Sequence, residues 1–335
     1  MVETQRVLRD RTASSRRPRQ VTPLWPPPRV AWLIACVALF VGCGGDTEDP
    51  AAEDHDQPAY VTESQIAFVS NRDGYRRIYV MNTDGTNQRA ISDPPYGGDN
   101  SPAWSPDATQ IAFVYDGEGN DEIYVMDADG GSRHNISNSP DTRDSNPAWS
   151  PDGASIAFTS DREGRGVFVM DASGADARRI YHEGGRPSWA PDGGRLAFVA
   201  SSSGHSNVSV WNVAGGQPRV VARTPDRNAW TAWSPDGEWI ATTTDKHEPR
   251  IPYDEWQSIM VMDTAGANAR TITNNPRGPD LAPTWSPDGR SIAYAAVDDS
   301  WLGGRSDIHV VNVADLSVRS LTNSRDFDSM PAWSP

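Results

Sequence analysis

The chain of 335 residues carries a net charge of −15, with 22% charged and 37% apolar residues. This acidic balance argues against nucleic acid as a partner, because phosphate binding needs a basic face. With 28 Gly and 27 Pro, the composition is typical of a folded, turn-rich protein rather than a disordered one. The length allows one large all-β domain or two ordinary domains.

Residues 1–42 have the pattern of an export signal. An arginine-rich start is followed by an apolar run from Val30 to Gly42. The run is too short for a transmembrane helix, which needs about 20 residues, and matches the apolar region of a signal peptide. It leads into the letters FVGC, which resemble the bacterial lipobox, although Phe40 stands where leucine is usual.

The lipobox resemblance implies that Cys43 is lipidated and becomes the new N-terminus. The alternative is an ordinary signal peptide followed by an incidental cysteine. The second cysteine of the chain is Cys36, inside the apolar run, so no disulfide is expected in the exported part. We therefore expect a lipid-anchored protein of the cell envelope, facing the periplasm or the cell surface.

Residues 43–62 predict a flexible tether. From Gly44 to Tyr60 the sequence is acidic and has almost no apolar residue before the tyrosine. Such a segment cannot bury enough surface to fold. The folded domain is expected at residues 63–335.

From Ile66 onward the sequence repeats a unit of short β-rich runs joined by turns. One run reads IAFVS, IAFVY, IAFTS, LAFVA, IATTT or IAYAA, and the next reads IYVMN, IYVMD, VFVMD, VSVWN, IMVMD or IHVVN. Largely apolar runs of this kind are typical of strands covered on both faces. SPDG and DG letters between the runs predict tight turns and hairpins; the calcium loop that a DxDG pattern suggests would lack its further ligands.

A tryptophan marks each unit, with spacings of 45, 40, 44, 52 and 48 residues, which suit one four-stranded propeller blade per unit. The letters PAW and their variants predict the innermost strand of a blade. The first unit, from Ile66 to Ser92, lacks this strand, whereas the chain ends on an extra copy, MPAWSP. We therefore predict an all-β, six-bladed β-propeller that is complete, with the C-terminal strand closing the first blade and removing its open edge.

The repeated letters PxWSPDGxxIAF and IYVMDxDG resemble the TolB-type β-propeller (WD40-like) repeat over nearly all of residues 65–335. TolB itself carries a separate α/β domain before its propeller, and about twenty residues separate Cys43 from the first predicted strand here. The role of TolB in the Tol–Pal system therefore does not transfer whole. The resemblance implies an exported propeller that binds other proteins or ligands.

Propeller geometry predicts one face of short, structural turns and a second face of longer, variable loops. Binding residues are usually found on such loops when a rigid scaffold holds them. The long segments 245–258 and 298–307 contain aromatic residues that act either as loop-packing anchors or as contacts to a partner. The aromatic candidates are Tyr253, Trp256 and Trp301, together with Trp230 just before an inner strand.

Four aspartates recur five residues before a blade tryptophan, where two other blades have Gly184 and Asn228. Each begins an inner strand, so we expect the four to face the channel entrance. One interpretation is that each caps its own loop by accepting backbone N–H bonds. The other is an acidic funnel for a cation or a basic segment of a partner. The four are Asp99, Asp144, Asp280 and Asp328.

Catalysis has little support in the sequence. No GxSxG motif is present, and the six histidines show no metal-ligand spacing. We predict a non-catalytic, monomeric binding module without a cofactor, a catalytic residue or a structural metal, which recognises an envelope protein or peptide and reaches the membrane through its lipid anchor. The alternative function is a carbohydrate-active or hydrolytic propeller enzyme.

Overall fold

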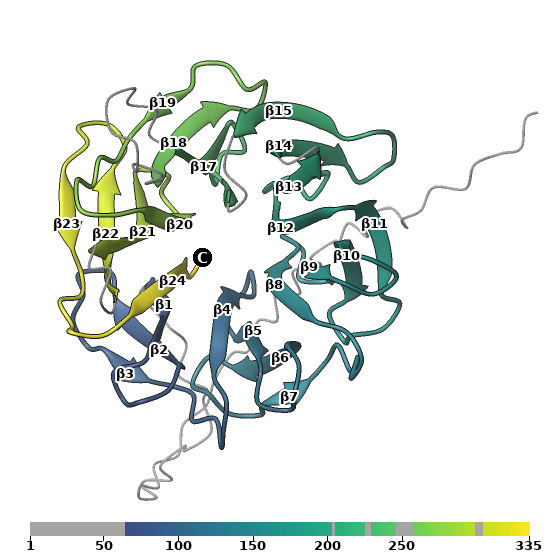
Figure 1. Cartoon of the computed structure of the whole chain (residues 1–335), viewed down its shortest axis with the longest axis horizontal. Helices are drawn as coiled ribbons and strands as arrows, with labels where there is room; N and C mark the ends of the chain where they lie inside the picture. Colours follow the sequence, from purple (N-terminus) through teal and green to yellow (C-terminus); the bar gives the residue numbers. More distant parts are fainter. Residues whose placement is uncertain (1–63, 203–204, 225–228, 246–256, 299–303) are drawn as a thin grey trace, which may run out of the picture. The chain divides into compact units, whose positions relative to one another are not determined.

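The computed structural model describes residues 64–202, 205–224, 229–245, 257–298 and 304–335. Within these ranges the chain forms six antiparallel sheets of four strands each. No helix of the described ranges is long and apolar enough to cross a membrane. The sheets follow one another around a central axis as the blades of a propeller, which confirms the predicted all-β, six-bladed fold (Figure 1).

Each blade contributes one strand to each of four layers, counted outwards from the axis. The innermost strands are β24 (Asp328–Trp333), β4 (Asp99–Trp104), β8 (Asp144–Trp149), β12 (Gly184–Trp189), β16 (Thr231–Trp233) and β20 (Asp280–Trp285). The second layer is β1 (Gln65–Ser70), β5 (Gln110–Tyr115), β9 (Ser155–Ser160), β13 (Arg195–Ser202), β17 (Trp239–Asp245) and β21 (Ser291–Asp298). The third layer is β2 (Arg77–Asn82), β6 (Glu122–Asp127), β10 (Gly166–Asp171), β14 (His205–Asn212), β18 (Gln257–Asp263) and β22 (Arg305–Asn312). The outer strands are β3 (Arg89–Ala90), β7 (His134–Asn135), β11 (Arg178–His182), β15 (Arg219–Thr224), β19 (Arg270–Thr271) and β23 (Val318–Ser320).

The first blade is assembled from both ends of the described chain. Its strand order is β24-β1-β2-β3, and we call this sheet blade 1; blades 2 to 6 follow in chain order from β4, β8, β12, β16 and β20. Strand β24 pairs antiparallel with β1, so that Ile66 lies opposite Trp333. The yellow C-terminal strand therefore lies beside the dark blue N-terminal one in Figure 1. The predicted closing strand is confirmed.

Tryptophans of the repeat connect neighbouring inner strands. The indole N–H of Trp104 in blade 2 donates to the carbonyl of Ala332 in blade 1, at 3.1 Å. Trp189 makes the same bond to the preceding blade, and so does Trp285. Each inner strand also contacts the inner strands of the blades before and after it, including β24 with both β20 and β4. The ring of blades is therefore closed through its centre.

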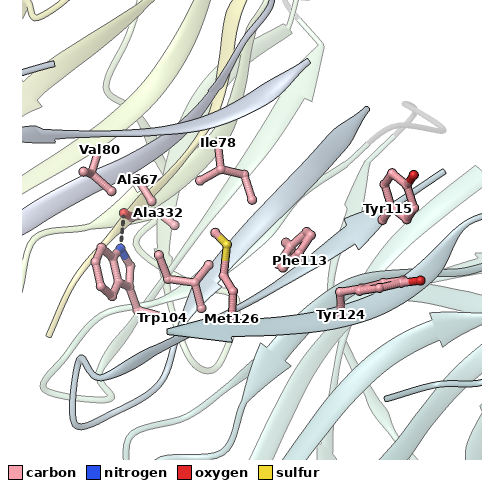
Figure 2. Packing of buried hydrophobic residues seen from close by; sticks show 10 residues of the cluster. Ala67, Ile78, Val80, Trp104, Phe113, Tyr115, Tyr124, Met126 and Ala332 are labelled. Carbon is pink, nitrogen blue, oxygen red and sulfur yellow. Dashed lines mark hydrogen bonds between the residues drawn. The ribbon is translucent and has the colours of Figure 1, made fainter. Parts of the chain in front are cut away.

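The apolar core lies between neighbouring blades, not within one sheet. In the cluster of Figure 2, Ile78 and Val80 of blade 1 pack with Phe113 and Met126 of blade 2. Five further clusters of buried residues are found in the described ranges. Because the neighbouring blades cover both faces of each sheet, the sequences of its strands are nearly continuous apolar runs.

The SPDG segments form tight turns whose fourth residue has a left-handed backbone conformation. Gly153 has φ of 70°, and its N–H donates to the carbonyl of Ser150. Blade 2 has alanine at this place, and Ala108 adopts φ of 57° with the equivalent hydrogen bond to Ser105. A residue with a Cβ is strained in this region, whereas glycine is not.

We expect Ala108→Gly to stabilise the protein by about 0.5 kcal/mol, because the relief of left-handed strain exceeds the backbone entropy that glycine loses on folding. The matched reverse change, Gly153→Ala, should destabilise by about 1 kcal/mol. Urea unfolding of both variants and the wild type is the measurement. A loss of stability in Ala108→Gly would contradict the assignment of strain to this turn.

Candidate functional site: the central channel

The inner strands contain a β-bulge next to their proline. Register in blade 2 shifts between Asn100 and Ala103, and blades 3, 4 and 6 shift at the equivalent place. The residue before each proline is left-handed, with φ between 49° and 53° in five blades. A bulge re-aims the side chain it carries, and non-glycine residues in this region are concentrated at functional sites. The five are Ser101, Asn146, Arg186, Ala282 and Met330.

These bulge residues line a channel between the inner strands, with a volume of about 340 Å³. Trp230, which precedes β16, lines it at the equivalent position of blade 5. We call the six the channel ring. Two residues further along each inner strand, small side chains line the channel below the ring: Ala103, Ala148, Ser188, Ala232, Thr284 and Ala332. The volume lies in the range of ligand-binding pockets.

The channel ring is chemically uneven. Blades 2, 3 and 4 contribute Ser101, Asn146 and Arg186, whereas blades 5, 6 and 1 contribute Trp230, Ala282 and Met330. One half is therefore polar and the other largely apolar. The flanking proline and tryptophan, by contrast, are shared by most blades. The fold retains its framework residues and varies the side chains that face the channel, which is the pattern of a binding site on a rigid scaffold.

Arg186 joins the two halves of the ring. Its guanidinium stacks on the Trp230 ring at 4.3 Å and donates to the carbonyl of Ala229 at 3.0 Å. The backbone is also fixed, because the Arg186 N–H donates to Thr159 and its carbonyl accepts from Thr231. Among the described residues that line the channel, Arg186 is the one that carries a charge.

The four predicted aspartates do not line the channel. Asp99, Asp144, Asp280 and Asp328 have no exposed surface. In a regular strand Asp99 would face the same side as Ser101 and Ala103, but the bulge between them breaks the alternation. The structure therefore differs from the expected ring of carboxylates open to the channel.

Three of these carboxylates pair with arginines. Asp99 pairs with Arg133 at 2.9 Å, Asp328 pairs with Arg72 at 2.8 Å, and Asp144 pairs with Arg162. Each guanidinium also lies over at least one aromatic ring of its own blade. The pairs join the start of an inner strand to the body of the blade. Capping of a loop by backbone N–H groups, the other interpretation of these aspartates, is not the principal contact found for these three.

Burial raises the pKa of Asp99 and of Asp144, and the guanidinium partner of each opposes that rise. Asp99 further accepts a hydrogen bond from Ser92 of blade 1, and Asp144 accepts one from Ser160. Asp280 lies near Tyr294, whose pKa is raised by burial and then by that carboxylate. A direct role of the four aspartates in binding remains an untested prediction, and their burial disfavours it.

The other sequence candidates divide into two groups. Trp230 lies in the channel lining, as a contact residue would. Tyr253, Trp256 and Trp301 lie outside the described residues, as does Cys43. The other five ring residues were not predicted from the sequence: Ser101, Asn146, Arg186, Ala282 and Met330. Their signal was variation at the third residue before the blade tryptophan, at a place where the flanking letters repeat.

No group of three or more His, Cys, Asp or Glu side chains in the described ranges could hold a metal ion. The described channel lining also contains no histidine, cysteine or carboxylate. The groups that usually act as general acids and bases are therefore missing from the part of the lining that the structure describes. What the lining offers is hydrogen bonding, one cation and apolar surface.

Fold and channel together define a six-bladed β-propeller with a variable ring of side chains that lines its channel. More particularly, the chain is similar to the TolB propeller: a family profile described as the TolB beta propeller domain matches residues 58–186. The Tol-Pal system protein TolB of Alcanivorax borkumensis is 31% identical over 96 residues, which are 29% of this chain and 20% of that protein. The chain thus matches about a fifth of the length of this relative.

Solved structures agree on the fold. TolB from Acinetobacter baumannii superposes with a TM-score of 0.67 at 23% identity, covering 81% of this chain and 67% of that one. A putative TolB from Agrobacterium tumefaciens gives 0.61 at 20% identity, covering 80% of this chain and 90% of that one. At these identities the likeness establishes the architecture.

Proposed function

We propose that the protein is a non-catalytic binding module of the bacterial cell envelope, which recognises a protein or peptide partner with the channel ring. The observation that carries the proposal is the ring itself, six different side chains on an otherwise repeated framework. The similarity to Tol-Pal system proteins supports a place in the envelope. A carbohydrate-active or hydrolytic enzyme would need an acid or base in the channel, and the described lining supplies neither.

The proposal can be tested directly with a variant whose side chain fills the channel. Asn146→Trp places a large side chain in the channel ring. Leu316→Ser is the control, because it changes an exposed residue outside the channel lining, beside outer strand β23. Envelope proteins captured by wild type and by Leu316→Ser, but not by Asn146→Trp, would be identified and purified. Binding would then be measured with the purified pair. Equal binding by the channel-filled variant would reject the channel as the recognition surface.

The anchor belongs to the same proposal. We expect Cys43→Ala to move the protein from the membrane fraction to the soluble fraction, because the several acyl chains of a bacterial lipoprotein, unlike one chain, hold it firmly. Cys36→Ala is the matched control, since it changes the other cysteine, inside the signal region, and should leave the protein in the membrane fraction. Fractionation and immunoblotting are the measurement. Retention of Cys43→Ala in membranes would contradict lipidation at this residue.

A further inference from the structure

We propose that a pocket between blades 5 and 6, separate from the channel, binds a small uncharged aromatic molecule. The pocket has a volume of about 430 Å³, which is in the range of ligand-binding sites. It lies where the SPDG turns and the hairpin of these blades meet, and its lining shares no residue with that of the channel. The inference goes beyond the proposed function, because it concerns a second site.

Two tryptophans form the apolar walls of this pocket together with Val261 and Val313. Trp285 is the repeat tryptophan of blade 6, whereas Trp239 is particular to blade 5. The first residue of the second-layer strand is polar in the other five blades, where it is Gln65, Gln110, Ser155, Arg195 or Ser291. Blade 5 instead has an indole at this place, partly buried against the core cluster that contains Trp285.

Blade 4 shows how a polar residue covers the neighbouring tryptophan. The Arg195 guanidinium lies over the ring of Trp233 at 4.7 Å, across the junction between blades 4 and 5. At the next junction, Trp239 takes the place of this arginine, and Trp285 lines an open pocket. Two indoles offer flat apolar surface, on which aromatic rings pack favourably in stacked or edge-to-face arrangements.

A change in one hairpin accounts for the space. In four blades a glycine of the hairpin before the outer strand packs against the preceding blade, as Gly130, Gly174 and Gly266 do. At the fourth, Gly85, an added Cβ would lie 2.7 Å from the carbonyl oxygen of Leu321. Blade 6 has Leu316 at this left-handed position, with the equivalent hydrogen bond to the carbonyl of Asn312. The leucine Cβ prevents so close an approach, and the pocket lies between this hairpin and blade 5.

The charges around the pocket favour an uncharged ligand. Asp236, Arg270 and Arg290 are exposed and bring both signs of charge to the rim. Arg270 donates to the carbonyl of Val313 at 2.9 Å, and Asp236 accepts from the hydroxyl of Ser234. A charged ligand would meet a like charge at the rim and would lose its hydration against the apolar walls. A neutral aromatic molecule suits both the walls and the rim.

Matched probes test this chemistry. Isothermal titration of the full chain would compare 2-naphthol with decahydro-2-naphthol, its saturated analogue, and with 2-naphthoate, which carries a charge. We expect 2-naphthol to bind wild type about 3-fold or more tightly than the saturated alcohol, because aromatic pairs gain more than the area they bury. Its advantage over 2-naphthoate should be about 10-fold or more, because an unpaired carboxylate is costly to bury.

The variant Trp239→Arg assigns the binding to the pocket. It introduces the residue that blade 4 has at this place, so the fold should be retained while the affinity for 2-naphthol falls about 10-fold or more. Gln110→Arg makes the corresponding change in blade 2, outside the pocket, and should leave the affinity unchanged. The selectivity of wild type among the three probes needs no variant, so misfolding of Trp239→Arg would leave the proposal testable.

Failure of 2-naphthol to bind wild type at millimolar concentration would overturn the proposal, and so would binding no tighter than that of either analogue. Unchanged affinity in folded Trp239→Arg would overturn it as well. If Asn146→Trp, which fills the channel, abolished 2-naphthol binding, the probe would lie in the channel and not in the pocket. Loss of partner capture in Trp239→Arg, with no binding of 2-naphthol by wild type, would assign the pocket to a side chain of the partner instead of a small molecule.

Discussion

Deletion of Met330–Pro335 is expected to lower the melting temperature by roughly 6–15 °C or to cause aggregation. The deletion removes four of the six residues of β24, including the partners of Ile66 and Ala67, so that blade 1 presents an open edge along that part of β1. It also removes the Ala332 carbonyl that accepts from Trp104, and the Trp333 side chain that packs on the apolar cluster of blades 1 and 6. Loss of a large core side chain alone costs about 3–5 kcal/mol, against a total stability of about 5–15 kcal/mol.

Met330→Ala is the control for this deletion, because it shortens a side chain of the channel ring and keeps the strand. It should melt within a few degrees of wild type. Thermal unfolding followed by circular dichroism is the measurement. A truncated protein that melts as wild type does would show that β24 does not contribute to the stability of the ring.

Arg133→Met is expected to destabilise the protein by about 3–5 kcal/mol at pH 7, because it leaves the buried Asp99 carboxylate without its partner. Without the guanidinium that opposes it, burial raises the pKa of Asp99 further. A carboxyl whose pKa is raised on folding contributes stability below its unfolded pKa and loses it as pH rises through the folded value. The loss in the free energy of unfolding of Arg133→Met, relative to wild type, should therefore be small near pH 4 and reach its full value at pH 7.

The double variant Asp99→Asn with Arg133→Met separates charge from packing. Asparagine removes the charge and keeps an oxygen that can accept from Ser92. The double variant should recover most of the stability that Arg133→Met loses at pH 7, and its unfolding should not share the steep pH dependence. Urea unfolding at both pH values is the measurement. A pH-independent deficit in Arg133→Met would mean that lost packing on Phe113 and Tyr115, not the unpaired charge, dominates.

The blades were predictable because their signal is repeated and local. Apolar runs of strand length, SPDG turns and tryptophans at blade spacing recur, and the misplaced MPAWSP copy identifies the closing strand. The ion pairs were not predictable, because their arginines do not recur at one position. Arg72 and Arg162 come from the loop after the second-layer strand, whereas Arg133 comes from the segment before an outer strand.

The channel ring was missed for a different reason. Alternation along a regular strand assigns each side chain to a face, but a bulge shifts that assignment without leaving a clear sequence signal. Five residues of this ring share the same left-handed backbone, although their side chains differ widely in chemistry and size. None of them is glycine, the residue that usually indicates this conformation in a sequence. Only comparison of the blades at the third residue before the tryptophan indicates the ring.

The pairing of β24 with β1 also has a consequence for how the chain folds. Hydrogen bonds in this pair join residues separated by about 270 positions, as between Gln65 and Ser334. Contacts of such long sequence separation form late, because the entropy of closing the loop must be overcome first. Blade 1 therefore stays three-stranded until β24 has been synthesised and has paired with β1. During that interval the protein would depend on its surroundings to keep the open edge of β1 from pairing with another chain.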